Sequence, residues 1–205
     1  MLKIWGRTNS VNVKKALWAL EELKLPYNRV DAGLQFGVVN TPEYRKLNPN
    51  GLVPTIDDDG FILWESHAIV RYLCAKHGAG GLWPSDLRVR ADADRWMDWA
   101  FTFASVLRPV FWNLIRTPPD KRDLKAIAEG TQKAGELATI VDTQLADRPF
   151  VAGETLTMGD IPLGCHLQIW FRLDIARPAL PRLQAWFERL CARPAYAKIV
   201  DTPLS

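Results

Sequence analysis

The stretch from Asn48 to Ile69 constrains the fold of this 205-residue chain more than any other. A turn-forming Asn-Pro-Asn-Gly tetrad opens it, and Asp59-Gly60 separates two short apolar runs, as the tight turn of a β-hairpin would. The second run stops at Glu65. From Ser66 onward the apolar residues recur at helical spacing, so Ser66 stands where a helix N-cap is expected. The sequence therefore predicts a strand that ends in an acidic residue where a helix begins.

This junction predicts a small binding site for a group that carries both charges. The Ser66 hydroxyl and the free backbone N–H groups of the first helical turn attract a carboxylate, while the Glu65 carboxylate attracts an ammonium group. The α-amino-acid end of a ligand has both groups.

Pro54 stands at the start of the first apolar run, where it donates no backbone hydrogen bond. It must therefore lie at a sheet edge, at the start of a strand or in a cis turn. A cis turn would leave the backbone of Val53 free to pair with an extended peptide, whereas an edge-strand proline needs no ligand. The sequence leaves these alternatives open.

The other elements place this hairpin in an α/β unit of the order βαβαββα, which ends near His77. Residues 2–5 and 27–30 read as strands on either side of an amphipathic helix, and Thr41-Pro42 opens a short helix. The following Gly-rich segment reads as a linker, and beyond it only helical patterns appear, with one long helix expected from Arg88 to about Arg116 and a second from Asp120 to Leu145. We expect a first domain over residues 1–78, a linker over 79–87 and an all-α domain over 88–205.

Three separated motifs carry a resemblance that covers the whole chain. They are Val53-Pro54-Thr55 followed by Glu65 to Ile69, the segment from Trp5 to Lys15, and Arg116-Thr117-Pro118-Pro119. In this order they resemble the soluble glutathione S-transferases, in particular their bacterial GstB-like branch. The resemblance implies a thioredoxin-like N-terminal domain that binds glutathione, a helical C-terminal domain and a homodimer.

A glutathione transferase must stabilise the thiolate of glutathione, because the thiolate is the nucleophile. The segment between the first strand and the first helix holds no tyrosine, but it offers Thr8, Ser10 and Asn12 as hydrogen-bond donors. We favour Asn12, with Ser10 next. Ser10 also has a purely structural interpretation as the N-cap of the first helix.

For the rest of glutathione, the resemblance assigns the γ-glutamyl end to Glu65 and Ser66, and the cysteinyl backbone to Val53 beside Pro54. Asn40 or Asn50 is the candidate for the glycyl carboxylate. The apolar electrophile pocket is expected between the domains, at Phe111, Trp112 and Arg116, and Arg116 has two interpretations: it orients an anionic electrophile or it pairs with Asp120.

Several other polar residues are expected to be structural. Asp94 and Asp98 are interpreted as surface acids that pair with Arg90 or Arg95, with contact to a neighbouring subunit's glutathione as the alternative. Asp160 belongs to a capping box that begins at Thr157. The three histidines lie at no metal-ligand spacing, so we expect no metal site.

Composition excludes other classes. A net charge of +3 with dispersed Lys and Arg argues against a nucleic-acid partner. The three cysteines are widely separated, which indicates reduced thiols and a cytoplasmic protein, and no apolar run is long enough to cross a membrane.

We therefore expect a glutathione S-transferase that attacks small electrophiles, and the resemblance to the GstB-like branch implies halogenated acids and amides as candidate substrates. A glutathione-dependent disulfide oxidoreductase and a non-catalytic module that binds glutathione or a partner are the alternatives.

Overall fold

The computed structural model describes residues 1–205 and contains one mixed four-stranded sheet with helices on it. The strands lie in the order β2-β1-β3-β4. Strand β1 pairs with β2 in parallel, and the β1–β3 and β3–β4 pairs are antiparallel. The elements up to the end of α3 are β1 (Leu2–Trp5), α1 (Val11–Glu22), β2 (Tyr27–Val30), α2 (Pro42–Leu47), β3 (Thr55–Asp58), β4 (Phe61–Trp64) and α3 (Ser66–His77), with a 3₁₀ turn at Leu34–Phe36.

The predicted βαβαββα order is therefore confirmed, and local chemistry explains its turns. Asp59 and Gly60 both have positive φ, as the tight hairpin between β3 and β4 requires, and Gly60 N–H donates to Asp57 Oδ1 at 2.7 Å. Thr41 caps α2 by accepting a hydrogen bond from Tyr44 N–H, with Pro42 as the first helical residue. Pro54 lies just before β3, and the Val53–Pro54 peptide bond is cis.

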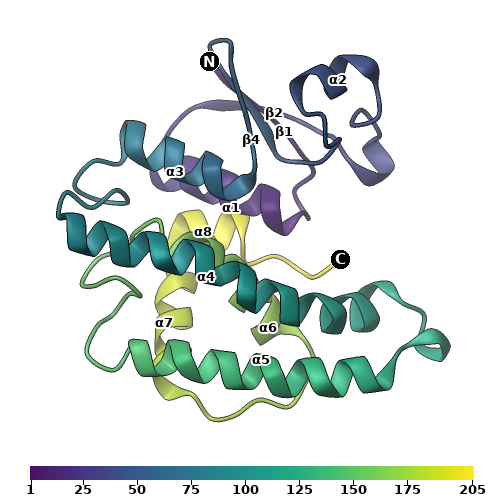
Figure 1. Ribbon diagram of the computed structural model, residues 1–205, viewed down its shortest axis with the longest axis vertical. Helices are drawn as coiled ribbons and strands as arrows, with labels where there is room; N and C mark the ends of the chain where they lie inside the picture. The colour runs from purple at the N-terminus through teal and green to yellow at the C-terminus, as the bar shows by residue number, and fades with distance from the viewer.

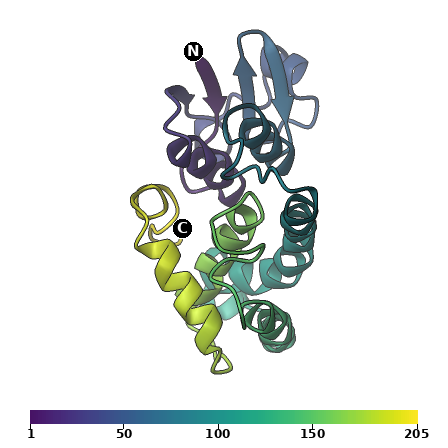
Figure 2. The same cartoon turned by 90° about the vertical axis from the view of Figure 1, so that its left-hand side faces the viewer.

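The rest of the chain is helical, as predicted. Figures 1 and 2 both show the sheet with α1–α3 at one end of the molecule and five helices at the other. These elements are α4 (Leu87–Phe111), which continues as a π-helical turn (Trp112–Arg116), a 3₁₀ turn (Pro119–Lys121), α5 (Leu124–Gln144), α6 (Asp160–Arg172), α7 (Pro181–Cys191) and α8 (Pro194–Ile199).

Two predicted helix boundaries were wrong. The helix expected from Asp120 begins only at Leu124, because Asp123 caps it by accepting from Ala126 N–H, and Pro119 holds the residues before it in a 3₁₀ turn. At the hairpin's end, Glu65 and not Ser66 is the N-cap residue, so Ser66 is the first residue of α3.

One continuous core joins the sheet unit to the helices through α1, which packs on α3, α6 and α8. The fully buried Trp18 ring lies against Gly164 of α6, where an added Cβ would stand 2.9 Å from it. Only glycine allows this close approach. The loop that precedes α1 is therefore held at a fixed place above the helical part of the chain.

The segment expected as a linker is ordered in this arrangement. Leu82 is buried, and its carbonyl accepts a hydrogen bond from Met158 N–H at 2.9 Å. None of the helices is both long and apolar enough to cross a membrane.

Candidate functional site: the ends of α1 and α3

The first turns of α1 and α3 meet at the end of the sheet. Asn12, in the first turn of α1, and Ser66, the first residue of α3, approach each other with 3.5 Å between Asn12 Oδ1 and Ser66 Oγ. Neither first turn contains an acidic residue, and Glu65, the N-cap residue of α3, makes no side-chain hydrogen bond to its first turn. The structure thus gathers free backbone donors from two helices around one place.

Asn12 is exposed, and its amide nitrogen Nδ2 makes no hydrogen bond within the chain, whereas Oδ1 accepts from Lys15 Nζ at 3.0 Å. Ser10 is the N-cap residue of α1, but its hydroxyl makes no capping hydrogen bond. The purely structural interpretation of Ser10 therefore has no hydrogen bond to support it. Thr8 lies two residues before Ser10 and is exposed. All three predicted thiolate donors thus stay on one short segment beside the N-terminus of α1.

Glu65 has an unusual backbone. Its φ of +73° lies in the left-handed region, which costs a residue with a side chain roughly 1–3 kcal/mol. Its side chain is exposed and takes part in no ion pair within the chain. Such strain at the junction of β4 and α3 is typical of residues whose position is set by a ligand rather than by folding.

The loop before β3 presents the backbone of Val53. No backbone hydrogen bond within the chain uses the N–H or C=O of Val53. Buried Asn48 organises this loop, since its Nδ2 donates to Leu52 O at 3.0 Å and its Oδ1 accepts from Asn50 N–H at 3.0 Å. Asn50 Nδ2 also bonds to Asn48, so its side chain is already engaged.

Arg45 is a residue of this region that sequence reasoning missed. It donates to Asn40 Oδ1 at 3.0 Å and to Pro49 O at 2.8 Å, and it packs beside Gly51, where a Cβ would clash with the guanidinium. A basic side chain in α2, between two loops rich in Asn and Pro, is a weak sequence signal. Its guanidinium is hydrogen-bonded to the Asn40 side chain, whereas the Asn50 side chain bonds to Asn48.

Phe111, Trp112 and Arg116 cluster at the end of α4. The Arg116 guanidinium lies 5.7 Å from the Phe111 ring centre and 5.9 Å from that of Trp112. Arg116 donates to the Ser205 carbonyl and makes no pair with Asp120, so that interpretation was wrong. The 3₁₀ turn at Pro119 carries Asp120 on an exposed segment instead.

Arg7 is the second residue that the sequence did not reveal. It is half-buried at the start of the Thr8–Asn12 segment, and its Nε and Nη1 atoms have no partner. Burial and the nearby Arg116 guanidinium lower the pKa of Arg7. Two guanidinium groups close together favour an anion, and the Ser205 oxygen already accepts from one of them, Arg116.

Asp94 and Asp98 do not pair with Arg90 or Arg95. Both accept from Arg71 of α3, with 2.6 Å between Arg71 Nε and Asp94 Oδ1. The predicted pairing was wrong because it placed both partners on the same helix, whereas Arg71 comes from α3, which lies beside α4 (Figure 1).

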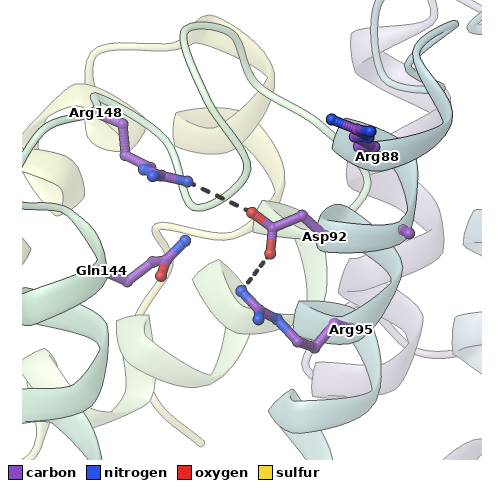
Figure 3. A pocket seen from close by; sticks show the side chains of 6 residues that line it. Arg88, Asp92, Arg95, Gln144 and Arg148 are labelled. Carbon is purple, nitrogen blue, oxygen red and sulfur yellow. Dashed lines mark hydrogen bonds and ion pairs between the residues drawn. The ribbon is translucent and has the colours of Figure 1, made fainter.

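A surface depression of about 580 Å³ lies elsewhere, between α4 and the end of α5 (Figure 3). Its charged lining residues are three arginines and one aspartate, and Asp92 accepts from both Arg95 and Arg148, the latter at 3.5 Å. It contains no residue of the Thr8–Asn12 segment or of the Glu65–Ser66 junction. We therefore place no chemistry there.

Comparison with known proteins decides the family. The model of the glutathione S-transferase N-terminal domain matches residues 9–76, and that of the C-terminal domain matches residues 102–194. The chain belongs to the glutathione S-transferase family. Its predicted family, fold class and transferase activity are thereby confirmed.

Individual relatives agree with this. Glutathione S-transferase GstB of Escherichia coli strain K12 is 41% identical over 208 aligned residues, with both chains covered completely. The theta class glutathione S-transferase of Xanthomonas axonopodis pv. citri, solved with glutathione bound, superposes with a TM-score of 0.95 at 49% identity, over 100% of this chain and 99% of that one. A probable glutathione S-transferase, GSTF2 of Oryza sativa subsp. japonica, is 29% identical over 78% of this chain and 76% of its own.

The remaining ionisable groups offer no second reaction centre. Cys74 and Cys165 are buried, and burial raises the pKa of each thiol to about 12, so neither is a reactive thiolate at neutral pH. No three His, Cys, Asp or Glu side chains come together in a way that could hold a metal ion.

Proposed function

We propose that this glutathione transferase binds glutathione across the ends of α1 and α3 and presents its thiolate to a small electrophile. The observation that carries the proposal is the exposed Asn12 amide, with a free donor, beside Ser66 at two uncapped helix ends. A thiol has an ordinary pKa of about 8.5, and each unit of lowering requires about 1.4 kcal/mol of preferential stabilisation of the thiolate. One or two hydrogen bonds to sulfur and a helix N-terminus supply this amount.

In this arrangement Glu65 pairs with the γ-glutamyl ammonium group, and the Ser66 hydroxyl with α3 N–H groups binds the γ-glutamyl carboxylate. The free backbone of Val53, next to Pro54, pairs with the cysteinyl backbone. Asn40, held by Arg45, is our choice over Asn50 for the glycyl carboxylate, because the Asn50 side chain is already bonded to Asn48.

Asn12 is the main donor to the sulfur, with Ser10 and Thr8 as the other donors of the segment. The test is an ultraviolet titration of the bound thiolate. Asn12→Ala should raise its titration midpoint by about one pH unit, whereas Thr8→Val, at the far end of the segment, should change it by less than about a third of that. An unchanged midpoint in the Asn12 variant would remove Asn12 from the mechanism.

The electrophile pocket is formed by Phe111 and Trp112, with Arg116 and Arg7 at its polar end. We propose that a small anionic electrophile, such as a halogenated carboxylic acid, is a better substrate than its neutral amide. Arg116→Met and Arg7→Met should each lower kcat/KM about tenfold for a haloacetate and by less than about threefold for the matching haloacetamide. Equal losses with both substrates would overturn the proposed charge preference.

A disulfide oxidoreductase activity would use the same glutathione thiolate. Assays with mixed disulfides and with alkyl halides compare the two reactions directly. We further propose that residues 1–78 are the glutathione-binding domain and residues 88–205 the helical domain, and that the protein acts as a cytoplasmic homodimer, as the family resemblance implies.

A further inference from the structure

Lys15, one turn after Asn12 in α1, is a charged residue with only 1% of its surface exposed. No carboxylate lies within ion-pair distance of its ammonium group. Its nearest polar neighbours are Asn12 Oδ1 and His67 Nε2, each 3.0 Å from Nζ. Burial lowers the pKa of Lys15 to about 8, although Cys165 and Glu65 partly oppose the shift. Burial of an ammonium group without a carboxylate partner costs folding free energy, so we expect Lys15 to have a function that offsets this cost.

The ammonium group determines how the Asn12 amide is turned. An ammonium donates hydrogen bonds and accepts none, so the atom of Asn12 that it contacts must be the carbonyl oxygen. Ser66 Oγ approaches the same oxygen at 3.5 Å. The Nδ2 donor is therefore directed away from Lys15 and remains without a partner in the chain. A rotated amide would place two donors against each other.

The same argument determines the protonation state of the His67 ring. Its Nε2 lies against the Lys15 ammonium group, so Nε2 must accept and the ring must be neutral. Burial, followed by the charges of Lys15 and Arg71, lowers the pKa of His67 to about 2. The ring is stacked on Phe101 of α4, with 4.0 Å between the ring centres. The Lys15 ammonium group thus contacts the stacked rings of His67 and Phe101 as well as Asn12 Oδ1.

We propose that Lys15 is a positioning residue of the glutathione site, which orients the Asn12 amide so that its N–H group points at the sulfur and adds a buried positive charge behind it. The inference rests on the proposed function. Lys15 does not touch the ligand, because its ammonium is enclosed by Asn12 and His67. It acts through Asn12.

The test compares Lys15→Met with Lys14→Met. The two variants lose the same charge from adjacent positions, but Lys14 Nζ binds Val200 O and Thr202 Oγ1 and does not contact Asn12. The measured quantity is the titration midpoint of bound glutathione thiolate. Lys15→Met should raise it by about one pH unit, and Lys14→Met should leave it within about 0.2 units. Equal midpoints in wild type and Lys15→Met would overturn the inference.

A double-mutant cycle separates orientation from general electrostatics. If Lys15 acts through Asn12, Lys15→Met should have less than about half of its effect in the Asn12→Ala background. A full effect in that background would show that Lys15 acts independently of Asn12 and would overturn the orienting role. Lys15→Gln keeps a donor for Asn12 Oδ1 and should give a midpoint between those of wild type and Lys15→Met. It also serves if the Met variant does not fold.

Wild-type protein distinguishes this inference from the proposed function. If wild type binds glutathione and lowers its thiol pKa but the Lys15 variants do so equally well, only the role of Lys15 is wrong. If wild type does not lower the thiol pKa at all, the proposed thiolate site is wrong, and the inference about Lys15 is overturned with it.

Discussion

Asn12 Oδ1 and Ser66 Oγ stand 3.5 Å apart although 54 residues separate them in the sequence. This approach joins the helix that follows the central strand β1 to the helix that follows the edge strand β4. A ligand held at one helix end is therefore within reach of donors from the other.

The strained Glu65 allows binding to be separated from folding. Glu65→Ala and Glu65→Gly both remove the carboxylate, so both should weaken glutathione binding at least about tenfold in calorimetry. Glycine adopts a φ of +73° without strain, so Glu65→Gly should be about 1 kcal/mol more stable to urea than Glu65→Ala. Unchanged affinity in both variants would contradict the role of Glu65 in binding.

The elements that the sequence predicted well are those with local causes. Asp59-Gly60 determines a hairpin turn and Thr41-Pro42 a helix start through contacts within a few residues. The Glu65–Ser66 junction was located correctly for the same reason, although the cap falls one residue earlier than expected. Such signals need no knowledge of the tertiary fold.

The missed residues depend on contacts between distant segments. In the sequence Lys15 resembles an ordinary surface lysine, and only the folded structure places His67 and Phe101 against it. The role of Arg7 depends on its proximity to Arg116, which lies more than 100 positions away in the sequence. The spacing of three residues between Asn12 and Lys15 was the available sequence signal, since residues at this spacing share a helix face.

The Arg71 ion pairs connect the sheet unit to α4 and should contribute modestly to stability. Asp94 and Asp98 are 49% and 69% exposed, and solvent screens pairs of this kind. Arg71→Met should destabilise the protein by about 1 kcal/mol in urea unfolding at low salt, and by less at about 1 M NaCl. Arg88→Met, on an arginine with no ion pair, is the control. A loss that does not depend on salt would indicate lost packing instead.

Asp160 should be among the most sensitive positions for folding. It is fully buried and accepts hydrogen bonds at 3.0 Å from Val151 N–H, Thr157 N–H and Trp186 Nε1. Asp160→Asn turns one acceptor into a donor that faces another donor, so it should cost at least about 2 kcal/mol in urea unfolding. Asp147→Asn changes an exposed carboxylate and should cost less than about 0.5 kcal/mol. Similar small losses of unfolding free energy in both variants would show that the buried hydrogen bonds of Asp160 do not stabilise the fold.

The lowered pKa of Lys15 predicts how its contribution to stability depends on pH. Its folded-state pKa of about 8 lies below the ordinary value of 10.5, so between these values the unfolded chain binds a proton that the folded chain does not. Stability therefore rises with pH across this window. The free energy of unfolding of wild type, relative to Lys15→Met, should increase by about 2 to 3 kcal/mol between about pH 7 and about pH 10.

Burial also lowers the pKa of the adjacent Lys14, but Lys14 is present in both wild type and Lys15→Met, so the comparison of the two proteins removes its direct contribution. Burial raises the pKa of Cys165 to about 12, and it lowers those of His67 to about 2 and of His166 well below its ordinary range. Lys125→Met, at an 83% exposed side chain, is the control and should show no such trend. If the difference in unfolding free energy between wild type and Lys15→Met did not change with pH, Lys15 would not be desolvated. The buried contact through which it orients Asn12 would then be contradicted.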